Sequence, residues 1–398
     1  MHTAAGLSGG GQRAGGGEIR SLTGLRGVAA ALVMLYHARP ASDVVPVEQA
    51  FRHGYLLVDL FFVLSGFVIA LGHRDMARGF SWPASRDFVG RRLARIYPLY
   101  IASTVLCLAV FAARFLRGFE DQLWQPPLLL AEAANALMIQ SWGLAGSFNG
   151  AAWSISTEWM AYLLFPVLCL AVLGRGRGAC VGVAAVAVAV LAALCLWPDA
   201  PAWHDTVPRL GPLDRMSQTS AAPLLRCVAE FCLGMAALRV HVAPPQWLDR
   251  HRGGIALAAL AGIVVLSAVP GSDCAVVLLM VPLVFGACGR GIVRGVLSLP
   301  PLHWFGRRSY SFYMLHVLVL DGWGSVAAAL HEAGLASGFV PVFATSFAVT
   351  TALSAATFRF VERPSTTGLR ALLSRGARAR RPGAGRPPRA AGAAGPPS

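Results

Sequence analysis

Two ionisable residues, Arg26 and His37, lie within the first apolar stretch of this chain, LTGLRGVAAALVMLYHA. They are eleven positions apart, so a helix carries both on one face with about 16 Å of rise between them. An arginine at the centre of a membrane span costs roughly 2.5–3.5 kcal/mol, so such groups normally face protein or water. The pair is a candidate catalytic site, with Arg26 near the inner surface and His37 toward the outer side. The alternative is that Arg26 reaches lipid phosphate and His37 only ends the span.

Asp59 begins the second apolar stretch, LLVDLFFVLSGFVIA. If the first two helices are antiparallel, this carboxylate lies at the depth of His37. There it would hold the imidazole in one tautomer and stabilise its protonated form. The alternative is an interfacial aspartate that faces water. Ser65 and Gly66 in the same stretch permit the close approach of another helix.

A pair of arginines, Arg92 and Arg95, precedes the third apolar stretch in GRRLARIYPLY. The spacing of three residues lets both guanidinium groups point the same way at the membrane surface, and Pro98 follows three residues later. Arginine clusters bind phosphate in a bidentate manner, which favours a phosphate site. The alternative is that they only anchor the helix end at the inner membrane face.

Further polar residues lie where lipid is expected. Glu158 lies inside WSISTEWMAYLLFP, and an unpaired carboxylate there is costly, so we expect it to meet an arginine, a histidine or a ligand. Tyr313 and His316 lie in SYSFYMLH at a spacing of three, which places them on one helical face. Glu362 lies in FRFVERP, which can be read as a helix end that Pro364 stops.

The elements that must position these residues are membrane helices. The 398-residue chain is 56% hydrophobic and 13% charged, a balance typical of a protein whose solvent is the bilayer. Ten apolar runs are long enough for a span. They cover residues 22–38, 56–73, 97–114, 153–173, 179–197, 222–240, 254–269, 274–290, 309–330 and 338–358. We predict an all-α polytopic membrane protein, with an interfacial or re-entrant segment at 127–142.

Charge sets the predicted orientation. The formal net charge is +15, and every basic residue other than histidine is arginine. The arginines gather between alternate apolar runs, which places both chain termini in the cytoplasm and argues against a nucleic-acid platform. We therefore predict a flexible tail at 1–18, a transmembrane domain at 19–365 and a disordered basic tail at 366–398. Seven of the eight cysteines lie in apolar stretches, which indicates free thiols, and no metal-site spacing is present.

Six strings, taken in order over residues 19–365, resemble the acyltransferase-3 family of bacterial integral membrane acyltransferases. They are LTGLRGVAAALVMLYHA, VDLFFVLSGFVIA, RRLARIYPLY, WSISTEWMAYLLFP, SYSFYMLH and FVERP. The family's motif of an arginine and a histidine with ten residues between them falls on Arg26 and His37. Its motif of two arginines and a proline, each separated from the next by two residues, falls on Arg92, Arg95 and Pro98.

The chain departs from the family pattern in two ways. Thr23 stands where many relatives have aspartate before GLRG. A hydrolase-like soluble domain, which the two-domain members carry, does not follow the last predicted span.

The resemblance implies transfer of an acyl group, commonly acetyl, from cytoplasmic acyl-CoA to a hydroxyl. Arg92 and Arg95, with Arg26 deeper, would hold the donor's phosphates, since CoA is a polyanion. His37, oriented by Asp59, would act as general base or would itself carry the acyl group. Further candidates for the site are Ser65, Glu158, Tyr313 and His316.

The expected setting is the cell (plasma or inner) membrane, with membrane lipid, the acyl-CoA donor and a hydroxyl acceptor as partners and with neither nucleic acid nor a metal. A cell-surface glycan or glycolipid is the first choice of acceptor, and a secreted macrolide-type metabolite is the alternative. In a different class, a transporter of a polar lipid or glycan would also need intramembrane arginine, histidine and glutamate.

Overall fold

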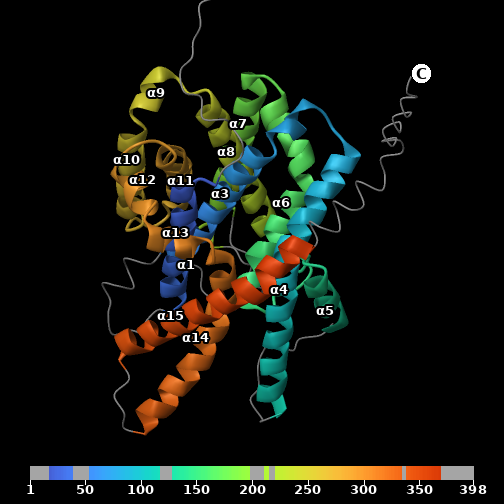
Figure 1. Cartoon of the computed structure of the whole chain (residues 1–398), viewed down its shortest axis with the longest axis vertical. Coiled ribbons are helices and arrows are strands. Elements are labelled where there is room, and N and C mark those ends of the chain that lie inside the picture. The colour runs from blue at the N-terminus through green and yellow to red at the C-terminus, as the bar shows by residue number, and fades with distance from the viewer. Residues whose placement is uncertain are drawn as a thin grey trace, which may run out of the picture.

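The computed structural model describes residues 18–38, 53–116, 128–197, 210–214, 220–333 and 338–368. These residues form helices and turns, with no β-strand among them (Figure 1). The predicted tails lie almost entirely outside these ranges. The first half of the chain holds α1 (Arg20–His37), η1 (Gly54–Leu56), α3 (Leu57–Gly72), η2 (Arg74–Arg78), α4 (Trp82–Leu116), α5 (Leu128–Ala136), η3 (Gly150–Ala152), α6 (Trp153–Cys169), η4 (Leu170–Gly174) and α7 (Arg177–Leu196). The second half of the chain holds α8 (Ala222–Val242), α9 (Gln246–Arg250), α10 (Arg252–Leu266), α11 (Asp273–Ala287), α12 (Ile292–Leu297), α13 (Pro300–Gly306), α14 (Ser309–Glu332), α15 (Phe339–Thr357) and η5 (Phe358–Glu362).

Each of the ten predicted apolar runs coincides with a helix. In the described part of the chain, five helical stretches are both long and apolar enough to cross a membrane: Gly54–Gly72, Trp82–Arg114, Gly150–Gly174, Arg177–Leu196 and Phe339–Gly368. The apolar helices α10 and α11 have only 15 residues each. The all-helical fold is therefore confirmed, while a count of ten spans and the orientation of the termini stay predictions.

The segment at 127–142 contains one short helix, α5, of nine residues. Nine residues rise only about 14 Å, which is half of a bilayer core. The irregular backbone after it is tied to its neighbours by buried amides, since Asn135 Nδ2 donates to Gly146 O at 2.8 Å and Gln140 Nε2 donates to Ser147 Oγ at 3.0 Å. Such internal pairing is what irregular backbone needs at membrane depth.

The centre of the molecule is built on close contact between α3 and α8. A Cβ atom added at Gly66 would collide with the backbone carbonyl of Phe231, and one added at Gly234 would collide with the carbonyl of Val63. Glycines therefore allow the two backbones to touch, as predicted for Gly66. α1, α6 and α11 complete the layer around α3.

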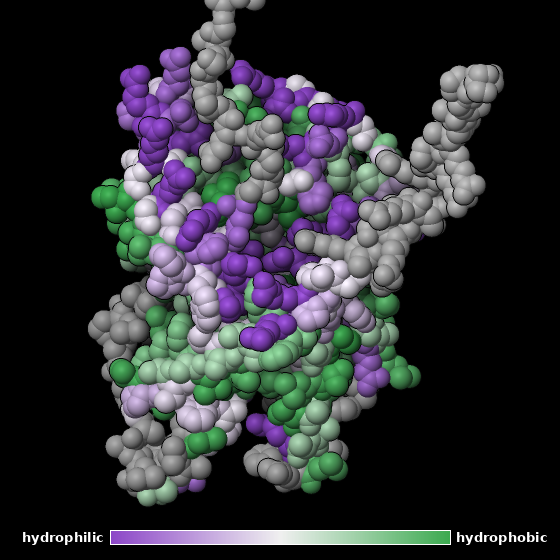
Figure 2. All heavy atoms as spheres, viewed as in Figure 1, coloured by the Kyte–Doolittle hydropathy of each residue, from purple (hydrophilic) through white to green (hydrophobic). Residues whose placement is uncertain are grey.

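The surface separates into two zones in Figure 2, where apolar side chains cover the lower part around α4, α14 and α15 and hydrophilic side chains gather above them. Large apolar side chains such as Val105, Val340 and Leu353 are exposed on these helices. Exposed apolar faces of this extent are typical of helices that meet lipid.

Candidate active site

A cavity of about 360 Å³, which we call the arginine pocket, brings together five of the residues singled out from the sequence. Its walls come from the first turns of α1, the end of α3, the middle of α4, α6 and the start of α14. The side chains of Arg26, Arg92, Arg95, Ser65 and Glu158 line it. Three guanidinium groups from two helices thus face one space, although 66 residues separate Arg26 from Arg92.

The carboxylates near the arginine pocket have partners of their own. Ser65 Oγ donates a hydrogen bond to Glu158. Glu362 is almost fully buried in the π turn η5, accepts a hydrogen bond from Ser311 at 3.1 Å and lies 3.8 Å from Arg95. Glu362 thus lies behind the pocket, where it contacts Arg95, and is more than a helix end. Because the arginines outnumber the acidic residues that line the cavity, the pocket favours an anion.

Two further observations characterise the arginine pocket. Arg92 Nε is buried and has no hydrogen-bond partner among the described residues. Such a donor is costly to leave unpaired, which indicates that a ligand or water meets it. His73 also lines the cavity, and burial together with the charges of Arg92 and Arg91 lowers its pKa. Its ring is mainly neutral at pH 7, so the positive charge of the pocket comes from the arginines.

His37 lies at the other end of α1, about 16 Å of helical rise from Arg26. Its ring contacts that of His316 on α14, with 3.3 Å between His37 Nδ1 and His316 Nε2 and 5.0 Å between the ring centroids. His37 is exposed, whereas His316 is 1% exposed. The two histidines come from positions 279 residues apart in the sequence.

Backbone carbonyls define the tautomers of this histidine pair. His316 Nδ1 lies 2.6 Å from Tyr313 O, and His37 Nδ1 lies 2.9 Å from Val33 O. Because a carbonyl oxygen only accepts, both Nδ1 atoms carry hydrogen. In neutral rings His316 Nε2 then holds a lone pair and can accept from His37 Nδ1–H, which leaves the lone pair of His37 on its Nε2 atom.

Polar contacts fix α14 beside this histidine pair. Tyr313 OH and Ser154 Oγ of α6 are 2.9 Å apart, and Asn149 Nδ2 donates to Met314 O at 2.9 Å. The predicted shared face of Tyr313 and His316 is therefore present, with 5.4 Å between their rings. These bonds hold the backbone carbonyl that in turn orients His316.

The structure corrects the expectation for Asp59. Both of its carboxylate oxygens accept hydrogen bonds from Arg226 of α8, so the carboxylate serves a buried ion pair instead of the His37 imidazole. Glu230, one turn further along α8, lies 3.7 Å from Arg226. All three residues are at most 2% exposed. The physical reason is the close approach of α3 and α8, which puts an arginine directly opposite Asp59.

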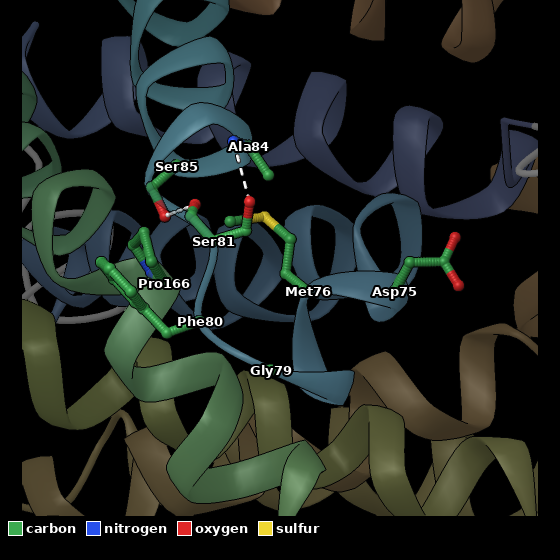
Figure 3. Close-up of a pocket in the computed structure, with 8 residues that line it drawn as sticks. All are labelled: Asp75, Met76, Gly79, Phe80, Ser81, Ala84, Ser85 and Pro166. Atoms are coloured by element: carbon green, nitrogen blue, oxygen red, sulfur yellow. Dashed lines mark hydrogen bonds between the residues drawn. The ribbon is translucent and has the colours of Figure 1, made fainter.

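Another pocket, shown in Figure 3, has no comparable chemistry. It measures about 150 Å³ and lies between the η2–α4 connection and Pro166 of α6. Ser81 caps α4 by accepting from Ala84 N at 3.5 Å, and Ser85 Oγ donates to Ser81 O at 2.8 Å. The Asp75 carboxylate points away from the other side chains in Figure 3. These polar groups serve the local backbone.

Within the described residues, no three His, Cys, Asp or Glu side chains converge as metal ligands, and the eight cysteines form no disulfide. The candidate active site therefore consists of the arginine pocket and the histidine pair, which lie at opposite ends of α1.

Comparison with known proteins shows the family of this chain. The family profile described as an acyltransferase domain, that of the acyltransferase-3 family, matches residues 19–359. The chain belongs to this family. Among its relatives, acyltransferase MdmB of Streptomyces mycarofaciens is 28% identical over 323 residues, which cover 76% of this chain and 79% of the relative. Protein 2 in the picA locus of Rhizobium radiobacter is 31% identical over 148 residues, which cover 35% of this chain and 74% of the relative. No solved structure gives a significant match.

Proposed function

We propose that this acyltransferase is a multi-pass enzyme of the cell membrane that moves an acyl group, with acetyl as the first candidate, from cytoplasmic acyl-CoA to a hydroxyl of a cell-surface glycan or glycolipid. The observation that carries the proposal is the convergence of Arg26, Arg92 and Arg95 on one cavity, with His37 on the same helix as Arg26.

The donor suits the arginine pocket on grounds of charge. Guanidinium groups bind phosphate with paired hydrogen bonds, and the unpartnered Nε of Arg92 is a donor that a phosphate oxygen can satisfy. With the phosphates held there, the pantetheine arm would extend along α1 and bring the thioester toward His37.

The histidine pair suits the transfer step. His37 Nε2 would accept the proton of the acceptor hydroxyl, while the hydroxyl oxygen attacks the thioester carbonyl and the C–S bond breaks. The CoA thiolate then takes up the proton, which balances the reaction. The route through an acyl-histidine stays open. There Nε2 attacks the carbonyl and the C–S bond breaks; the hydroxyl oxygen then attacks the acyl group, the C–N bond breaks, and the hydroxyl proton passes to the CoA thiolate.

In this mechanism His316 takes the orienting role that the sequence suggested for Asp59. Its Nε2 can accept from His37 Nδ1–H, a hydrogen that the Val33 carbonyl also receives, so His316 helps to hold the imidazole in the orientation that exposes Nε2. It is a positioning residue, because it acts through His37.

The proposal is tested with His37→Ala in purified, lipid-reconstituted enzyme. Loss of a general base costs about 10²–10⁴-fold in rate, so acyl-CoA-dependent transfer should fall by at least that factor while folding is kept. The control is His251→Ala, since His251 is an exposed histidine at the end of α9 whose ring contacts the Trp247 carbonyl of that helix. Normal transfer by the His37→Ala enzyme would refute the proposal.

Two measurements separate the open alternatives. A radiolabelled acyl group trapped on the protein after mixing with acyl-CoA alone supports the covalent route. If no label is trapped and the kinetics are those of a ternary complex, the covalent route is excluded. Mass spectrometry of surface glycans and secreted metabolites, from cells with and without the gene, identifies which acceptor carries the added acyl group. Movement of a lipid or glycan without consumption of acyl-CoA would instead indicate a transporter.

A further inference from the structure

A second basic cavity adjoins the arginine pocket on the other side of the α1 start. It measures about 740 Å³ and is formed by the first turn of α1, the end of α11 and α12. Arg20, Arg290 and Arg294 line it. Glu18 and Ile19 line both cavities, so the two spaces lie next to each other at the beginning of α1.

The arginines of this second cavity, which we call the α12 pocket, have no carboxylate within ion-pair distance among the described residues. Its one acidic lining residue, Glu18, accepts a hydrogen bond from Thr23 at 2.9 Å and lies 3.2 Å from His303. Three uncompensated guanidinium groups around one hollow favour a ligand with several negative charges.

The positive charge of the α12 pocket does not depend on histidine at neutral pH. His241 lines it, but burial and the nearby charge of Arg252 lower the pKa of this imidazole to about 4. The Arg252 guanidinium donates to His241 Nδ1 at 2.8 Å, which requires an unprotonated nitrogen there. The pocket therefore offers fixed arginine charge.

We propose that the α12 pocket binds the 3′-phosphorylated adenosine of the acyl-CoA donor, whose diphosphate lies at the arginines of the adjoining arginine pocket. This inference rests on the proposed function. A single elongated donor with phosphates at two separate points can reach both cavities, which lie next to each other at the start of α1. The 3′-phosphate would pair with the arginines of the α12 pocket, and the diphosphate with those of the arginine pocket.

Two glycines, Gly291 and Gly295, are also part of the lining of the α12 pocket. A Cβ atom added at Gly295 would meet no heavy atom within 4 Å, so the backbone of α12 is accessible there. Gly291 adopts a φ of +125°, a conformation that favours glycine and that a side chain would strain. A planar base and phosphates can approach such a wall closely.

The test compares two donors in nanodiscs. Arg290→Gln/Arg294→Gln should raise the KM for acetyl-CoA about 10- to 100-fold, since charged hydrogen bonds to phosphate are lost, and leave kcat within about twofold. With S-acetyl-pantetheine, which lacks the nucleotide, wild type and variant should have equal kinetics. The matched control is Arg175→Gln/Arg177→Gln, because these two arginines are exposed and lie outside both pockets.

Direct binding makes the outcome independent of turnover. Adenosine 3′,5′-bisphosphate should bind the purified wild type in calorimetry and bind the double variant at least tenfold more weakly. Equal binding by the two proteins overturns the inference, even if acetyl-CoA is a good substrate.

An equal rise in KM for both donors also overturns the inference, because the change then acts on the fold. If the double variant changes the kinetics with both donors, and does so only when the nanodisc contains anionic lipid, the α12 pocket binds a lipid headgroup instead. The proposed function fails separately if wild-type enzyme turns over neither donor.

Discussion

Removing the carboxylate of Asp59 should cost folding stability and leave the chemistry intact. Asp59→Ala strands Arg226, which is 2% exposed, in an apolar helix bundle. Breaking a buried ion pair costs about 3–5 kcal/mol. Glu230 lies 3.7 Å from Arg226 and can assume part of the pairing, so we expect the lower half of this range. Because the entropy of unfolding is about 2.1 cal/mol/K per residue, 1 kcal/mol shifts the midpoint of a 398-residue chain by roughly 1 °C, and the unfolding midpoint should fall by about 4–5 °C.

Replacing both partners should recover most of this loss. Asp59→Leu/Arg226→Met removes the two charges together and fills the space with apolar atoms, an exchange that is often neutral. Thermal unfolding in detergent, followed by the amount of monodisperse protein after heating, measures all variants. The control is Asp75→Ala, because the Asp75–Arg78 pair is more than four-fifths exposed and such pairs contribute about 0–1 kcal/mol.

Activity per folded molecule decides the role of Asp59. If Asp59→Ala is as stable as wild type yet transfers no acyl group, the carboxylate acts in the reaction and the ion pair is not its purpose. If the double variant is no more stable than the single variant, the pairing with Arg226 does not explain the loss.

Two other predictions concern histidines. His316→Ala should lower kcat about 10- to 100-fold and leave the KM for the donor unchanged. His316→Gln should recover part of the rate, because the glutamine Oε1 can accept from His37 Nδ1–H. Equal rates in wild type and both variants would contradict the orienting role. Because the folded-state pKa of His241 is lowered to about 4 from 6.5, the unfolded chain binds its proton first, and stability should decrease as the pH falls from about 6.5 toward 4. Unfolding midpoints measured across this range should fall less in His241→Gln than in wild type, and parallel curves would exclude His241 as a cause.

The helices followed from the sequence because apolar runs leave the backbone no other way to satisfy its hydrogen bonds in lipid. Much of the arginine pocket followed too, since Arg26, Arg92 and Glu158 are expensive in an apolar setting and each needs a polar neighbour. Which helix lies beside which could not be predicted. The contact of His37 with His316 and that of Asp59 with Arg226 depend on helix packing across 279 and 167 residues.

A signal for the Asp59 partner was nevertheless present. Arg226 and Glu230 are ionisable residues one turn apart in the apolar stretch 222–240, which is the same pattern that drew attention to Glu158. The α12 pocket was beyond prediction for a different reason. Arg290 and Arg294 belong to an arginine-rich connection, and the preference of arginines for the cytoplasmic side is enough to explain them in the sequence. The fold is needed to show that they lie beside the start of α1.

The π turn η5 makes the spacing of the last apolar stretch as important as its residues. A π turn holds one residue more than an α-helical turn, so the face that α15 presents cannot be extrapolated from Phe339–Thr357 to Glu362. Deleting one residue from 358–362 would restore the α-helical repeat and rotate Glu362 by about 100°, away from Arg95. Among related sequences, chain length between α15 and this glutamate is therefore expected to tolerate change less than the apolar residues that surround it.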